Sequence, residues 1–149
     1  MDTIWLGGAE WMAVLRIGLG LWWLESWRHK DKKTWSEGAG IAWAADMAAK
    51  HRWTAVRSGF ATVVGPRPKA VAYVVLYAEL ALGAGLILGF LTPVALVGGL
   101  LLNVLYFTLM IHDWAEQGQN SMMALISVVA LFGMSWQTWS LDGALGWFQ

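Results

Sequence analysis

The chain alternates between long apolar segments and shorter polar ones. Four apolar segments stand out, at residues 10–27, 70–90, 93–112 and 120–136. A helix that crosses a membrane needs about 20 mostly apolar residues, within a range of roughly 17–25. The pattern therefore predicts an all-α integral membrane protein. We expect a bundle of four transmembrane helices that forms a single domain over residues 1–149.

The connections between these segments differ in length and polarity. Thr92-Pro93 lies between the second segment and the third. Proline is tolerated at the start of a helix, so this pair predicts a tight break after which the third helix begins. Residues 113–119, with the sequence DWAEQGQ, predict a short polar connection between the third segment and the fourth.

The connection between the first two apolar segments, residues 28–69, is too long for a simple turn. Within residues 46–64, apolar side chains recur at helical spacing, at Trp53, Val56, Phe60 and Val63. This spacing predicts an amphipathic helix that lies in the membrane interface. The connection is then either a structural loop along the membrane surface, or a lid or docking surface for a partner.

Positive charge is concentrated in this same connection. Nine of the ten Lys and Arg residues lie between Arg28 and Lys69, and none follows Lys69. Lys and Arg accumulate in cytoplasmic loops, so residues 28–69 are expected to face the cytoplasm. Both termini are then external, in a multi-pass protein of the inner membrane of a prokaryote. Trp residues near the expected helix ends, such as Trp27 and Trp136, are typical of the membrane interface.

The composition agrees with a membrane protein and excludes several kinds of site. Hydrophobic residues make up 58% of the chain and charged residues 13%, against about a quarter charged in ordinary soluble domains. The net charge of zero gives no reason to expect a nucleic-acid partner. Since the chain has no Cys, disulfides, thiolate metal sites and Cys nucleophiles are excluded. No signal peptide is evident, so we expect the first apolar helix to be retained.

Two charged residues fall within the apolar segments, where charge is costly unless it is paired or functional. Arg16 lies in the first segment and Glu79 near the middle of the second. Because the two helices are expected to be antiparallel, we predict an Arg16–Glu79 ion pair that faces the interior of the bundle. This pair is either a structural clamp, or the polar floor of a quinone-headgroup site or an element of a proton relay.

Other polar side chains within the apolar segments are candidates for a quinone or polar pocket, namely Tyr77, Asn103 and Tyr106. Each carries groups that need hydrogen-bond partners if the side chain is buried. His112 is a possible ligand, but it has no second His at ligand spacing. We therefore expect neither a metal ion nor a haem.

Three motifs resemble those of one family. RIGLGLWWLESW (residues 16–27), ELALGAGLILGFLTPVA (79–95), and EQGQNSMMALISVVALFG (116–133) followed by WSLD (139–142) are similar to motifs of the DoxX/DoxD family. The resemblance implies a four-helix membrane bundle with Arg16 and Glu79 as the family's intramembrane polar pair. DoxD-type members are associated with a membrane thiosulfate:quinone oxidoreductase. The chain departs from the family at Pro93, where a basic residue is common, and at residues 25–27, where a Gly-x-x-Lys pattern is common.

Two functions follow as hypotheses. The chain is either a small membrane subunit of a quinone-linked redox complex, or a non-catalytic accessory or scaffold subunit of a larger respiratory or photosynthetic complex. Under the first hypothesis it helps to form a quinone site and is at most an oxidoreductase subunit that needs a partner. A transporter is a weaker alternative, because the sequence has no inverted repeat.

Overall fold

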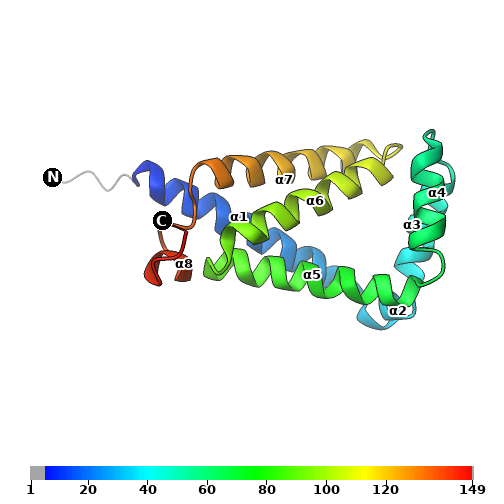
Figure 1. Cartoon of the computed structure of the whole chain (residues 1–149), viewed down its shortest axis with the longest axis horizontal. Coiled ribbons are helices and arrows are strands. Elements are labelled where there is room, and N and C mark those ends of the chain that lie inside the picture. The colour runs from blue at the N-terminus through cyan, green and yellow to red at the C-terminus, as the bar shows by residue number, and fades with distance from the viewer. Residues whose placement is uncertain (1–5, 149) are drawn as a thin grey trace.

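The computed structural model describes residues 6–148, and these residues form eight helices without strands (Figure 1). The expected all-α fold is therefore confirmed for this part of the chain. In chain order, the helices are α1 (Gly8–His29), α2 (Lys32–Ser36), α3 (Ala39–Ala49), α4 (Thr54–Val63), α5 (Pro68–Leu88), α6 (Thr92–Leu109), α7 (Trp114–Phe132) and α8 (Leu141–Ala144).

The four long helices pack around one another. α1 packs most extensively on α5, and α6 on α7, while α1 also contacts α7 and α5 also contacts α6. Consecutive long helices run in opposite directions (Figure 1). Their shared core is a cluster of buried side chains contributed by all four helices, with Leu19, Trp23, Leu86, Leu96, Met123 and Ala130 at its centre.

Two of these helices, α5 and α6, are long and apolar enough to cross a membrane. α1 carries Glu10, Arg16 and Glu25, and the first two turns of α7 are strongly polar. α1 and α7 are long enough to cross a membrane but for this reason too polar to be counted with α5 and α6. Their crossing of a membrane stays a prediction.

The fourth long helix begins earlier than the sequence pattern predicts. α7 starts at Trp114, so most of the expected polar connection at residues 113–119 is helical. Asp113 explains this start, because its carboxylate accepts hydrogen bonds from the backbone N–H groups of Ala115 (3.0 Å) and Glu116 (3.2 Å). Most of these polar residues thus form the first two turns of α7 rather than a loop.

The expected single helix over residues 46–64 is instead parts of two helices. α3 ends at Ala49, and α4 begins at Thr54. His51, which is fully buried between them, accepts a hydrogen bond at Nδ1 from the backbone N–H of Trp53 (3.0 Å). This bond holds Trp53 in an extended conformation that helix geometry does not allow.

The short helix α2 precedes these two and starts at a side-chain cap. The Asp31 carboxylate accepts hydrogen bonds from the Thr34 hydroxyl and from the backbone N–H of Lys33 (3.2 Å). These hydrogen bonds, that from Thr34 above all, lower the pKa of Asp31 below its usual value.

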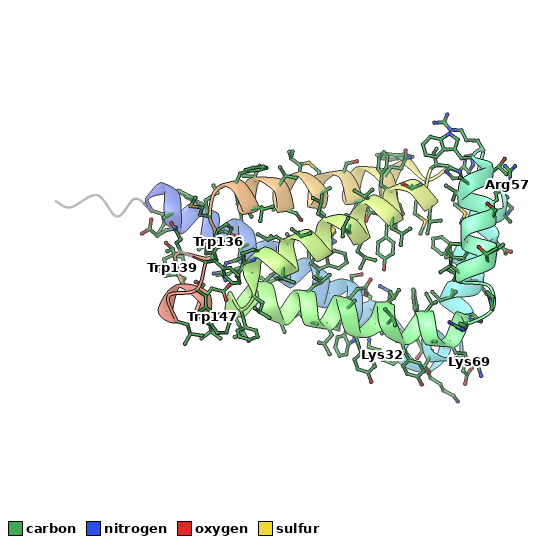
Figure 2. All side chains as sticks on the ribbon, viewed as in Figure 1. Lys32, Arg57, Lys69, Trp136, Trp139 and Trp147 are labelled. Carbon is green, nitrogen blue, oxygen red and sulfur yellow. The ribbon has the colours of Figure 1, made fainter. Side chains whose placement is uncertain are left out.

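The two ends of the molecule differ in chemistry. α2, α3 and α4 lie at one end, where Lys32, Arg57 and Lys69 project outward (Figure 2). α8 lies at the opposite end, together with Trp136, Trp139 and Trp147 (Figure 2). We call these the basic end and the Trp end.

Candidate functional site

The predicted Arg16–Glu79 ion pair is wrong. Glu79 pairs with Lys30, while Arg16 donates hydrogen bonds to backbone carbonyls near the C-terminus. The register of α1 against α5 explains the error. A Cβ at Gly20 of α1 would lie only 3.0 Å from the carbonyl oxygen of Gly83 on α5.

In this register Glu79 lies level with Ser26, whose hydroxyl is 3.4 Å from the Glu79 carboxylate. Arg16 lies ten residues before Ser26 on the same helix, which is about 15 Å along the helix axis. The two charges therefore belong to different ends of the bundle, and each is neutralised where it lies.

At the Trp end, the fully buried Arg16 holds the C-terminal segment in place. Its Nη2 donates hydrogen bonds to the carbonyl oxygens of Trp139 (2.6 Å) and Thr138 (3.3 Å). Gly89, in the turn between α5 and α6, lies directly against the Arg16 guanidinium and Ser140. Arg16 is thus a structural contact of this end.

Asp142 of α8 completes the same contact. Its carboxylate accepts hydrogen bonds from the backbone N–H groups of Leu91 (2.8 Å) and Thr92 (2.7 Å), at the start of α6. Its own N–H donates to the carbonyl oxygen of Gly89 (2.9 Å). Asp142 is fully buried at the same end of the bundle as Arg16. Its negative charge offsets the positive charge of Arg16 there.

Towards the basic end, Glu79 is the centre of a second buried cluster. Lys30 Nζ donates hydrogen bonds to both carboxylate oxygens, at 2.6 and 2.8 Å, and the Tyr106 hydroxyl donates to one of them at 3.0 Å. Lys30 Nζ also donates to the Ser26 hydroxyl (3.0 Å). Glu79 is fully buried, whereas 15% of the Lys30 side chain is exposed. We call Ser26, Lys30, Glu79 and Tyr106 the Glu79 cluster.

Lys30 was missed as a site residue because it belongs to a basic run that is typical of a solvated surface. One sequence signal was present. Lys30 follows Ser26 by four residues, so both lie on the same face where α1 ends. That face turns towards α5, because α1 and α5 pack along most of their length.

The position of Glu79 also differs from its expected depth. Although Glu79 lies midway along α5, the first turns of that helix extend past the ends of α1 and α6 and pack against α2 and α3. Glu79 therefore lies beside the last turn of α1 and close to the last turn of α6, where Tyr106 is.

A cavity of about 280 Å³ lies beside the Glu79 cluster. Its polar lining residues are Ser26, Lys30, Tyr106, Glu116 and Gln119. All of α3, α4, α5, α6 and α7 contribute lining residues. Most of the remaining lining is apolar or aromatic, including Trp35, Trp43, Ile41, Phe60, Val71, Val75 and Leu109. α3 contacts both α5 and α6, and α3 and α4 lie across this end of the bundle (Figure 1). Residues of both helices line the cavity.

Trp35 lines the cavity and also contacts Lys30 of the Lys30–Glu79 ion pair. The Lys30 ammonium lies 4.9 Å from the centre of the Trp35 ring, a distance at which the ring face attracts a cation. Gly40 allows this arrangement, since a Cβ there would lie 2.5 Å from the Trp35 ring. Lys30 is thus held between an aromatic ring and a carboxylate.

The other two predicted pocket residues lie elsewhere. Tyr77 is 64% exposed and stacks on Tyr73, with ring centres 6.4 Å apart, outside this cavity. Asn103 is fully buried one turn before Tyr106, and neither its amide nitrogen nor its amide oxygen has a hydrogen-bond partner within residues 6–148. Of the three, only Tyr106 lines the cavity.

This arrangement favours a ligand without negative charge and with polar atoms at one end. The Glu79 carboxylate and the Lys30 ammonium neutralise each other, and Glu116 adds a further carboxylate to the lining, so the cavity has no unpaired positive charge to attract an anion. Its apolar walls with a few convergent polar groups are typical of small-molecule sites. Within residues 6–148, no His, Asp or Glu side chains gather in a group that fits a metal ion.

Comparison with known proteins does not assign the chain to a family. No protein-family model, curated protein or solved structure matches the chain.

Proposed function

We propose that this protein is a small integral-membrane subunit of a quinone-linked redox complex, and that the cavity beside the Glu79 cluster binds the quinone headgroup. One observation carries the proposal. A buried, charge-neutral cluster with hydroxyl and ammonium groups faces a cavity of about 280 Å³ whose walls are mostly apolar and aromatic. A quinone ring needs the same combination, because it is a flat apolar ring with carbonyl oxygens that accept hydrogen bonds.

A bound quinone would take up two electrons and two protons on reduction, with the electrons supplied by a redox centre in a partner protein. The chain's own residues would orient the ring and hold protons near it. Lys30 and Tyr106 carry the donors, and without a ligand both donate to the Glu79 carboxylate. A bound quinone carbonyl would take over one of these hydrogen bonds from Glu79. Trp35 and Trp43 would exclude water from the ring.

The proposal includes a topology in which all four long helices cross the membrane. It is supported by their mutual packing, by the apolar length of α5 and α6, and by the chemistry of the two ends. Lys and Arg gather at one end and several Trp residues at the other (Figure 2). By the positive-inside rule, the basic end faces the cytoplasm and both termini are external.

Membership of the DoxX/DoxD family is also proposed. It is supported by the contacts among the three motifs that carry the resemblance. Arg16 of the first motif donates a hydrogen bond to the carbonyl of Trp139 in the third motif. Asp142 of the third motif accepts a hydrogen bond from the backbone N–H of Thr92, which lies in the second motif at the start of α6. Motifs that are far apart in the sequence are thus parts of one contact.

Binding of decylubiquinone to the purified full chain in mild detergent tests the proposal, with bound quinone measured after equilibrium dialysis. We expect saturable binding near one quinone per chain. Tyr106→Phe should weaken it by roughly three- to tenfold, the effect of one lost hydrogen bond. Tyr77→Phe is the matched control and should leave binding unchanged, because Tyr77 lies outside the cavity.

The accessory-subunit hypothesis makes the opposite prediction. The chain would retain no quinone, would co-purify in fixed stoichiometry with a large redox or photosynthetic complex, and would support full activity of that complex as Glu79→Gln. That result would overturn the quinone proposal and leave the Glu79 cluster as a structural contact.

A further inference from the structure

A groove between α5 and α6 lies next to the cavity beside the Glu79 cluster and shares one lining residue with it. The groove has a volume of about 620 Å³, and the residues that line it are apolar. Small residues hollow it out from both walls, among them Ala78, Ala81 and Gly85 on α5 and Ala95 and Gly98 on α6. We call it the α5–α6 groove.

The groove and the cavity meet at one residue. Leu105 lines both, and the next residue, Tyr106, belongs to the polar side of the cavity. On α5, Val75 lines the cavity and Ala78 lines the groove one turn later. α5 and α6 lie close together near α8 and diverge towards α3 and α4 (Figure 1).

We infer that the ligand of the cavity is a long-chain amphiphile, a quinone with an apolar tail, whose ring occupies the cavity and whose tail lies in the α5–α6 groove. This inference rests on the proposed function and adds the tail site to it. The cavity alone has room for a ring but not for a chain. Between Leu91 and Leu105 the groove follows α6 for about 21 Å, at 1.5 Å per residue.

The chemistry of the groove fits a hydrocarbon chain better than it fits a protein helix. α5 and α6 are long and apolar enough to cross a membrane, and Val94 and Leu101, which line the groove, are more than half exposed. A tail in this groove would remain in the hydrocarbon layer while its ring lies near the basic end. A helix could fill the groove but could not extend into a cavity of this size.

A second groove, between α1 and α7, is the competing site. It has a volume of about 520 Å³ and also reaches the cavity, but it does so at the polar side chain of Gln119. The α5–α6 groove shares the apolar residue Leu105 with the cavity, so a tail that runs from the cavity into this groove would pass an apolar side chain there. This difference decides between the two grooves.

Two probes separate the ring site from the tail site, namely decylubiquinone and the same benzoquinone ring without a tail. Gly98→Leu places a large side chain in the α5–α6 groove, where a Cβ meets only Leu82 at 3.6 Å. We expect Gly98→Leu to weaken decylubiquinone binding by at least roughly fivefold, the order expected of an overpacked contact, and to leave binding of the bare ring unchanged. Ala81→Leu fills the groove from its other wall and should act alike, which keeps the test valid if Gly98→Leu does not fold.

Gly18→Leu is the matched control, because it fills the α1–α7 groove in the same way and has open space around it. It should leave binding of both probes unchanged. The inference is overturned if Gly18→Leu alone weakens decylubiquinone binding, or if no groove variant affects it. If neither probe binds the wild-type chain, the proposed function itself fails.

Discussion

Individual charged residues in this protein are neutralised locally rather than across the bundle. Glu79 is paired with Lys30, whereas Arg16 donates hydrogen bonds to backbone carbonyls and has Asp142 as the nearby negative charge. Both Glu79 and Arg16 are fully buried. An ion pair of this kind is weak support for stability, because desolvation of the charges offsets much of their attraction. Loss of one partner is costly, since the other charge is then buried alone.

The Lys30–Glu79 pair gives a prediction at this scale. Glu79→Ala should destabilise the protein by about 3 kcal/mol, because the Lys30 ammonium is left unpaired in a mostly buried site. The double variant Lys30→Met/Glu79→Leu should recover more than half of that loss, since no charge remains to be desolvated. Unfolding in mixed micelles with increasing SDS measures both free energies. A double variant that is as unstable as the sum of its single variants would contradict this account.

At the scale of elements, one turn organises the Trp end. The turn between α5 and α6 contains Gly89 with φ +65° and Leu91 with φ +50°, both in the left-handed region. α8 packs on this turn through Asp142, and Arg16 of α1 lies against Gly89. Elements from both termini and from the middle of the chain are therefore joined by a few hydrogen bonds.

Gly89→Ala tests this joint. A Cβ would cost about 1–2 kcal/mol for the left-handed backbone alone, and it would also collide with Arg16 and Ser140. We therefore expect a loss of at least about 2 kcal/mol in SDS unfolding and easier proteolysis of the segment from Gln137 to Asp142. Gly59→Ala, where nothing lies within 4 Å of the added Cβ, is the control and should not destabilise the protein. Equal stability of the two variants would show that the joint does not matter.

At the scale of the whole molecule, the polarity of the two ends is the main feature. α2, α3 and α4 form the basic end and contribute lining residues to the cavity, while α8 and its neighbouring Trp residues form the other end (Figure 2). If the long helices cross a membrane, these ends lie on opposite faces. A ligand from the lipid would then enter between α5 and α6 rather than from water.

Cysteine labelling tests this topology. The natural chain has no Cys, so only an introduced thiol would be labelled. Ser58→Cys and Ala144→Cys each introduce one exposed thiol, the first on α4 and the second on α8. In intact cells stripped of any outer membrane, a membrane-impermeant maleimide should label the Cys at 144 and should label the Cys at 58 only after lysis. The reverse pattern would invert the proposed orientation, and labelling of both sites in intact cells would exclude the topology.

Periodicity and composition determined the elements of this fold. Helices lie at each of the four apolar segments because a run of apolar residues between polar breaks leaves little alternative to a helix, as with α5 and α6. Local hydrogen bonds shifted their limits, as Asp113 did for α7 and His51 did between α3 and α4. Such short-range bonds leave only a weak signal in the sequence.

The sequence by itself thus determined the helical class, the apolar character of α5 and α6, the concentration of positive charge in one segment and the presence of Arg16, Glu79 and Tyr106 within apolar segments. Only the tertiary structure decided which of these residues meet. Contact of Gly20 with Gly83 sets the register of α1 on α5, and that register brings Glu79 to Lys30 and leaves Arg16 with the C-terminal segment. The physical reason is that the closest approach of two helices depends on small residues and shape along the whole interface, whereas a sequence pattern gives only approximate depth.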